Sequence, residues 1–179
     1  MPIEPGRHTF GPENATLTVE TKRTGAASKA GHDLVIEVTS WAATLDVAED
    51  PAVTLTADAG SLRVREGRGG IQALGDDDKA GIEQTIDEEV LKGTTIEFRS
   101  SEVELSPDRT RGSVRGELEL AGSRRPLSFE LSSSEDGRLR ARATLKQSDW
   151  GMKPYSGLFG TLKVVDEVEV AVDASLAGS

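Results

Sequence analysis

The stretch Val114-Arg115-Gly116-Glu117-Leu118-Glu119-Leu120 decides the fold class, because apolar or small residues alternate with charged residues along its whole length. An alternation with a period of two places the apolar side chains on one face of a β-strand and the charged side chains on the other. A strand with one dry face and one wet face is typical of an antiparallel sheet. The stretch therefore predicts a half-buried antiparallel strand.

The same alternation recurs on both sides of this stretch. In three places the apolar positions change parity, near Ser40, Gly60 and Ser100. A change of parity inside a strand indicates a β-bulge, which bends a strand as barrel closure requires. Tight-turn residues such as Glu135-Asp136-Gly137 separate consecutive strands and favour an up-and-down connection. We expect an all-β, eight-stranded antiparallel barrel, with strands at about residues 15–23, 33–47, 53–65, 94–105, 110–121, 124–133, 137–148 and 164–176.

One segment breaks the period of two. Ile82, Ile86 and Val90 recur every four residues, which places them on one face of a helix. The acidic run at residues 76–78 is suited to cap the start of a helix, and Gly93 is suited to end it. The sequence thus predicts one inserted α-helix at about residues 78–92, lying against an end or a flank of the barrel.

Composition narrows the classes of function. The chain has 179 residues, a formal net charge of −10 and no cysteine. The length suits one domain spanning residues 1–179, and the charge opposes nucleic acids and anionic membrane surfaces. Without cysteine there are no disulfides and no cysteine-ligated zinc. We see no apolar run long enough for a secretion signal or a membrane span, so we expect a soluble, cytoplasmic protein.

Three stretches together carry a resemblance to a known family. They are Gly31-His32-Asp33-Leu34-Val35-Ile36-Glu37-Val38, Ile96-Glu97-Phe98 with residues 114–122, and Ser148-Asp149-Trp150-Gly151-Met152 continuing through residues 157–160 to 166–168. In these stretches and their order the chain resembles the YceI-like, polyisoprenoid-binding family, from about Arg7 to Leu176. The resemblance implies a lipocalin-like barrel around an apolar cavity. It also implies a chain-like ligand, such as a polyisoprenoid, an isoprenoid quinone or a fatty chain. Many members carry a secretion signal that we do not see here.

The residues themselves favour a cavity inside the barrel. The expected inward positions include many small residues, namely Ala43, Ala57, Ala59, Gly116, Ala141 and Ala143. An eight-stranded barrel is just wide enough to be filled by side chains or to hold one slender ligand, and small residues leave room. The alternative is a barrel filled by Phe98, Phe129, Trp41 and the helix. We expect the cavity to be lined by Val19, Ile36, Val38, Leu55, Phe98, Leu118, Phe129, Ala143 and Val170.

The segment from Gly151 to Gly160 places apolar residues between glycines, where a solvated loop would carry polar ones. It is interpreted as an apolar rim or lid at the mouth, or equally as a plug that closes one end. The expected rim residues are Trp150, Met152, Lys153, Tyr155, Leu158 and Phe159. A polar head group is expected near the mouth, within reach of hydrogen bonds from Trp150, Lys153 or Tyr155.

Three other groups of residues have a structural interpretation. His32 and Asp33 are adjacent on a strand and point to opposite faces, so we expect His32 to make a structural hydrogen bond. The acidic run at 76–78 lacks the ligand spacing of a calcium loop. The outward Arg138, Arg140 and Arg142 are expected to form a solvated charge ladder with acids such as Glu130 or Glu119 on neighbouring strands.

We therefore predict a lipid-binding protein that holds or carries an amphipathic lipid with a long apolar tail, with no catalytic residue, no metal and no cofactor other than such a lipid. The first alternative is an enzyme that uses His32 with a carboxylate on a hydrophobic substrate. The second is an interaction module without a ligand. A homodimer is left open.

Overall fold

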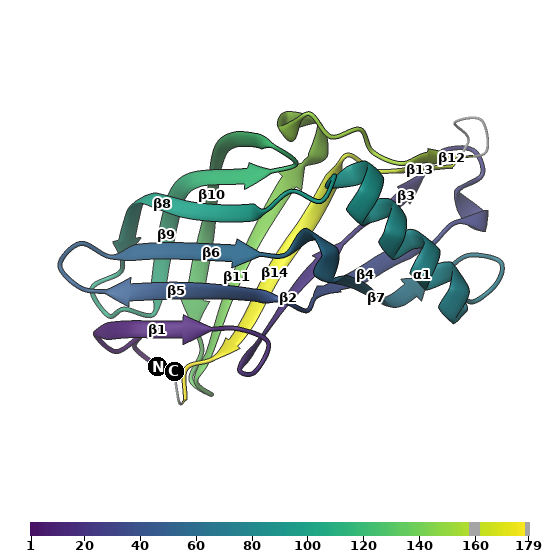
Figure 1. Cartoon of the computed structure of the whole chain (residues 1–179). Coiled ribbons are helices and arrows are strands. Elements are labelled where there is room, and N and C mark those ends of the chain that lie inside the picture. Colours follow the sequence, from purple (N-terminus) through teal and green to yellow (C-terminus); the bar gives the residue numbers. More distant parts are fainter. Residues whose placement is uncertain (158–161, 178–179) are drawn as a thin grey trace.

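The computed structural model describes residues 1–157 and 162–177. It shows an all-β, antiparallel and strongly curled sheet, with one helix lying along it (Figure 1). The predicted all-β class with a single α-helix is confirmed within the described ranges.

Eleven strands form the main sheet, in the order β1-β5-β6-β8-β9-β10-β11-β14-β2-β4-β7. Their bounds are β1 Gly6–Phe10, β2 Ala15–Glu20, β4 Asp33–Val38, β5 Trp41–Val47, β6 Ala52–Ala57, β7 Leu62–Arg68, β8 Ile96–Leu105, β9 Arg111–Leu120, β10 Ser123–Ser133, β11 Arg138–Lys146 and β14 Glu167–Ser175. A second sheet has the order β12-β13-β3, with β3 Arg23–Thr24, β12 Ser156–Gly157 and β13 Leu162–Val164. Short 3₁₀ turns lie at Ser28–Ala30, Ala59–Ser61 and Gln147–Trp150.

The prediction of eight strands is wrong, because two of the predicted strands are each divided in two. The expected strand at 33–47 breaks at Thr39-Ser40 into β4 and β5, and the strand at 53–65 breaks at the turn Ala59–Ser61 into β6 and β7. Thr39 and Ser61 are joined at the break, where the Thr39 N–H donates to the Ser61 carbonyl at 2.9 Å. The sequence pattern does not predict strand β1.

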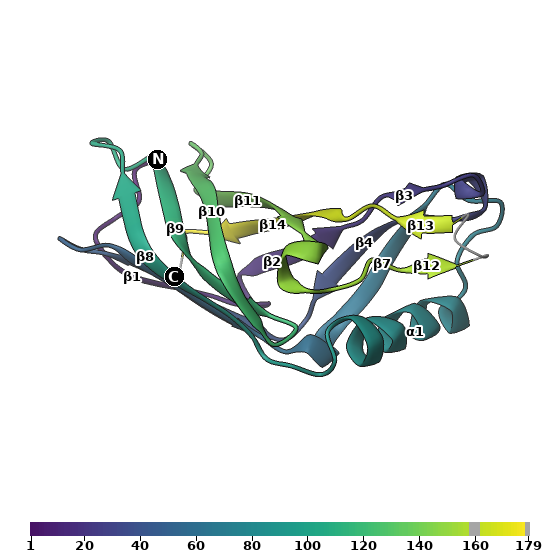
Figure 2. The ribbon, with the colours of Figure 1, turned by 90° about the horizontal axis from the view of Figure 1, so that it is seen from above.

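The divided strands form one long hairpin that bends at its middle. In one half of the hairpin β5 pairs with β6, near one end of the strand order. In the other half β4 pairs with β7, at the opposite end of the strand order. No pairing joins β1 to β7 in the described part of the chain. The sheet is thus strongly curled, and the bent hairpin, continuous through the Thr39–Ser61 and Ser40–Asp58 hydrogen bonds, connects the two ends of the strand order (Figure 2).

Bulges account for further curvature. The register of β8 against β9 shifts between Ser100 and Glu102, where the change of parity predicts a bulge. A second shift, between Val35 and Ile36 on β4 against β7, has no such signal in the sequence.

The predicted helix is present with small changes at its ends. Helix α1 spans Asp76–Thr85 and continues as a π-helical turn at Ile86–Val90. The carboxylate of Asp78 accepts a hydrogen bond from the Gly75 N–H at 3.0 Å, so this acid caps the first turn as expected. Gly93 has a φ of +63°, the left-handed conformation that commonly ends a helix.

Candidate ligand cavity

A cavity of about 790 Å³ is lined by residues of the main sheet on one side and by residues of α1 and the turn that continues it on the other. The strands contribute alternate residues to its wall, because every second side chain points to the concave face. The helix contributes Ile82, Ile86 and Val90, the three residues whose spacing predicts an apolar face. The wall is overwhelmingly apolar, which suits a hydrophobic ligand.

The structure places all the residues expected to line the cavity in its wall. They are Val19, Ile36, Val38, Leu55, Phe98, Leu118, Phe129, Ala143 and Val170. Phe98 and Phe129 also pack against each other, with ring centroids 5.4 Å apart. Trp41 is buried outside this wall, so it does not fill the cavity.

The small inward residues divide into two groups. Ala43, Ala57, Ala141 and Ala143 line the cavity and widen it. Gly116 and Ala59 do not belong to the wall. A Cβ atom at Gly116 would lie 2.3 Å from the Arg99 carbonyl oxygen, so this glycine allows β8 and β9 to approach closely rather than leaving room for a ligand.

The predicted rim is only partly at the cavity. Met152 and Tyr155 line it, whereas Trp150 and Lys153 do not. The indole N–H of the buried Trp150 donates to the Leu118 carbonyl at 2.9 Å, so it is already engaged and does not face a head group. Leu158 and Phe159 lie outside the described residues.

The turn Gln147–Trp150 that carries Trp150 is anchored by Asp166. The Ser148 backbone N–H donates to Asp166 Oδ1 at 2.8 Å, and the Ser148 hydroxyl donates to Oδ2. These two hydrogen bonds favour the carboxylate and lower the pKa of Asp166, the hydroxyl having the larger effect. Asp166 thereby fixes the segment that leads to Met152 and Tyr155.

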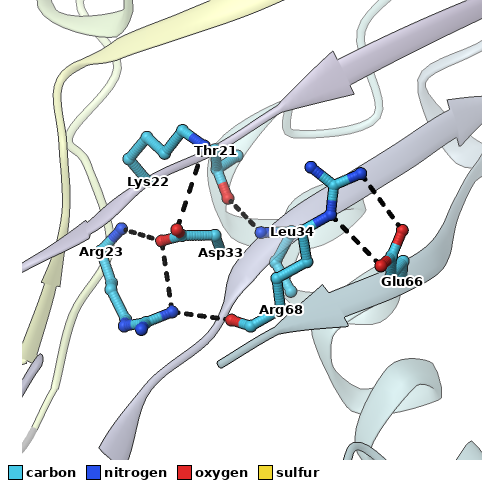
Figure 3. Close-up of polar contacts among 7 residues, drawn as sticks. All are labelled: Thr21, Lys22, Arg23, Asp33, Leu34, Glu66 and Arg68. Carbon is cyan, nitrogen blue, oxygen red and sulfur yellow. Dashed lines mark hydrogen bonds and ion pairs between the residues drawn. The ribbon is translucent and has the colours of Figure 1, made fainter. Parts of the chain in front are cut away.

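One end of the cavity carries polar residues that sequence reasoning missed, around Arg23 on β3 (Figure 3). The Arg23 side chain donates to the Arg68 carbonyl oxygen at 2.7 Å and lies 3.5 Å from the Asp33 carboxylate. Lys22 lies 3.9 Å from the same carboxylate. These contacts attach the small sheet to β4 and β7.

Other charged and titratable residues lie at this end. Arg23, His32 and Lys163 all belong to the wall of the cavity, as do Asp77 and Asp78 at the start of α1. Arg68 pairs with Glu66, and hydrogen bonding to that carboxylate raises the pKa of Arg68. A signal for this region exists in the sequence: residues 21–32 and 150–165 contain five lysines or arginines and no acid.

His32 has the structural role expected of it. Its Nε2 lies 2.6 Å from the Gln72 carbonyl oxygen, in the loop between β7 and α1. Asp33 contacts Arg23 and Lys22 instead, so the side chains of His32 and Asp33 are not directed at one common atom.

The arginine ladder is present, but its ion pairs differ from those expected. Glu130 is the cross-strand neighbour of Arg142, yet Arg142 pairs with Glu169, and Arg138 and Arg140 pair with Asp173. Glu169 and Asp173 both lie on β14, which pairs with β11 on the side opposite to β10.

Within the described ranges, no group of three or more His, Asp or Glu residues is arranged to hold a metal ion. In the same ranges, no helix has both the length and the apolar character needed to span a membrane.

Comparisons with known proteins agree with this geometry. A family model described as YceI-like domain matches residues 8–176. The chain is similar to the crystal structure of BcnA from Burkholderia cenocepacia, with 13% sequence identity, a TM-score of 0.63 and coverage of 89% of this chain and 94% of the other. It is also similar to a mutant YceI protein of Campylobacter jejuni, with 12% identity, a TM-score of 0.52 and coverage of 78% and 83%. At these identities the solved structures support the fold alone. Comparison with curated proteins finds no match.

Proposed function

Since the chain belongs to the YceI-like family, we propose that it binds or carries an amphipathic lipid with a long apolar tail. The observation that carries this proposal is the apolar cavity of about 790 Å³ between the sheet and α1. Pockets of a few hundred to a thousand cubic ångströms, lined by apolar residues with a few polar groups, are typical of small-molecule sites.

The size of the cavity suits a single chain-like tail. At about 30 Å³ for each water-sized group, the volume holds roughly 25 such groups. Each methylene removed from water contributes about 0.8 kcal/mol, so a tail of this length binds tightly even after the cost of ordering it. A polyisoprenoid, an isoprenoid quinone or a fatty chain meets this description.

The polar wall residues suggest how the lipid is oriented. The tail lies among the aliphatic residues and the Phe98–Phe129 pair, and the head group lies at the end with Tyr155, Arg23 and Lys163. Tyr155 is half exposed, so its hydroxyl is available to a head group at the opening. This geometry supports binding better than catalysis, because His32 is occupied by the Gln72 carbonyl oxygen.

Native mass spectrometry of the protein purified from its own cells tests the proposal. We expect a bound lipid that is released by organic solvent and identified by its mass, with one molecule for each chain. A second sample, stripped of lipid and mixed with solubilised lipid extract, is expected to regain the same species. Repeated isolation of lipid-free protein that takes up nothing from the extract would overturn the proposal.

A further inference from the structure

Gln147 is the one buried polar side chain in the cavity wall among the described residues. Three polar side chains are buried in that part of the chain, namely His8, Ser61 and Gln147, and only Gln147 belongs to the wall. The ring Nε2 of His8 lies 2.7 Å from the Glu4 carbonyl oxygen, and the Ser61 hydroxyl donates to backbone carbonyl oxygens. A buried polar group in a mainly apolar wall is the kind of group that fixes the orientation of a ligand.

Backbone hydrogen bonds fix the position of Gln147 just after the end of β11. Its N–H donates to the Asp166 carbonyl oxygen at 2.9 Å, and its own carbonyl oxygen accepts from the Met152 N–H at 3.1 Å. Its side-chain Nε2 donates to the carbonyl oxygen of Val165 at 3.3 Å, and Val165 directly follows Val164, the last residue of β13. Gln147 therefore lies where the small sheet meets the main sheet, next to the polar end of the cavity.

The contact with Val165 also determines which way the Gln147 amide points. The amide atom nearest to the Val165 carbonyl oxygen must be the nitrogen, because two oxygens would repel each other. The amide oxygen Oε1 is then directed away from Val165, and it accepts no hydrogen bond from the residues that the structure describes. Within the same ranges, the only fully enclosed side-chain nitrogen or oxygen without a partner is Trp41 Nε1. Because Gln147 lines the cavity, Oε1 opens into it.

An unpartnered amide oxygen in an apolar cavity selects a ligand that carries a hydrogen-bond donor. A ligand that removes this oxygen from water without donating to it leaves a buried acceptor unpaired, and this weakens binding. A hydroxyl group donates the missing hydrogen bond. An ether, an ester, a quinone carbonyl or an ionised carboxylate has no hydrogen to donate.

The charged residues at this end of the cavity favour neither an anionic nor a cationic head group. The wall contains Arg23 and Lys163, but it also contains Asp77 and Asp78. Arg23 is in addition 3.5 Å from the Asp33 carboxylate (Figure 3). Since cations and carboxylates lie together here, the net charge does not select an ion, and hydrogen bonding decides which head group is bound.

We infer that Gln147 determines the specificity for the head group, and that the ligand class is a long-chain alcohol whose uncharged hydroxyl donates to Gln147 Oε1. The inference rests on the proposed function and narrows it, because it names the head group that accompanies the apolar tail. The hydroxyl lies at the base of the small sheet, and the tail extends from it along the apolar wall.

Displacement of the neutral fluorescent probe N-phenyl-1-naphthylamine from lipid-free protein tests this inference. The three competitors are 1-dodecanol, 1-methoxydodecane and dodecanoate, which share a dodecyl-length chain and differ in the head group. We expect the alcohol to bind wild-type protein about tenfold more tightly than either of the others, because only the alcohol donates to Oε1. Gln147→Leu removes the acceptor and is expected to abolish the preference for the alcohol over the ether. Gln147→Met, which keeps the length of the side chain, replaces Gln147→Leu if that variant does not fold.

Gln84→Leu is the matched control, because Gln84 is exposed on α1 and lies outside the cavity wall. It is expected to keep the wild-type preference for the alcohol. Equal affinity of the wild type for alcohol and ether, tighter binding of dodecanoate, or an unchanged preference in a folded Gln147 variant would overturn this inference alone. Failure of all three competitors to displace the probe would overturn the proposed function as well.

Discussion

Filling the cavity from Ala143 is the sharpest test of the proposed binding mode. Ala143 lies on β11, is paired with Val170 on β14, and lines the cavity. The substitution Ala143→Phe adds a phenyl ring, which takes the place of about six water-sized groups among the roughly 25 that the cavity holds. Displacing six methylenes of a tail forfeits up to about 5 kcal/mol. Since a flexible tail can shift within the remaining volume, we expect a loss of affinity between about 10-fold and 100-fold.

The assay is fluorescence of cis-parinaric acid, a straight-chain fatty acid that becomes emissive in apolar surroundings. Thr144→Phe is the matched control, because Thr144 is the next residue on β11, is exposed and does not belong to the cavity wall. It adds the same ring to the outer face of the sheet and is expected to leave the probe's affinity unchanged. The lipid-free Ala143→Phe protein is expected to unfold at the wild-type temperature or above it, because the ring enters existing space.

Wild-type affinity of a folded Ala143→Phe protein for the probe would refute the reasoning, because the tail could not then occupy the space beside β11 and β14. A loss of affinity shared equally by Thr144→Phe would also refute it, since the effect would then come from the strand and not from the cavity.

Other consequences of the geometry are tested by stability measurements. Trp150→Phe leaves the Leu118 carbonyl without its donor, and urea unfolding is expected to show a loss of about 1–3 kcal/mol. Gly116→Ala forces a Cβ against the Arg99 carbonyl and is expected to destabilise the protein by about 1–3 kcal/mol. Gly81→Ala adds a Cβ in open space on α1 and is expected to stabilise the protein by about 0.5–1 kcal/mol. A more stable Gly116→Ala protein than Gly81→Ala protein would contradict the packing described. Because the pKa of Asp166 is lowered, its carboxylate stabilises the folded protein above the ordinary aspartate pKa of about 4, and this contribution is lost as the pH falls through the lowered pKa. We therefore expect the wild-type protein to lose more stability on acidification than Asp166→Asn does. Thermal unfolding at a series of pH values measures this difference.

The buried face of most strands could be predicted from the sequence, because apolar residues at every second position show which side of the strand faces the interior. Leu118 and Ala143 each lie between two charged or polar neighbours and Val170 follows Glu169, and the structure places all three in the cavity wall. Parity alone does not reveal how far a strand continues. The same change of parity marks a bulge at Ser100 and a complete break at Ser40, and only the hydrogen bonds between Thr39 and Ser61 distinguish the two.

The alternation of apolar and polar residues does not identify strands that are very short or that carry polar residues on their inward face. In β1 the inward positions are His8 and Phe10, and a histidine at an inward position hides the alternation. The paired segments of β3 and β12 have two residues each, too few for any period. The polar end of the cavity depends on these short strands, so the sequence pattern does not identify Arg23 and Lys163 as wall residues. Residues 21–32 and 150–165 contain lysines and arginines and no acid, which the sequence shows directly. Only the pairing of β3 with β13 shows that the two segments lie side by side.

The bent hairpin, the helix and the scarcity of aromatic residues together shape the cavity. An eight-stranded barrel is just wide enough to be filled by side chains or to hold one slender ligand, so the side chains decide whether space remains. By breaking twice, the hairpin supplies β5 and β6 near one end of the strand order and β4 and β7 at the other. The hairpin therefore joins the two ends of the curled sheet around the cavity, and α1 with the π-helical turn that continues it covers this space with Ile82, Ile86 and Val90. The scarcity of aromatic residues, 4% of the chain, then leaves this space unfilled even though Phe98 and Phe129 point into it.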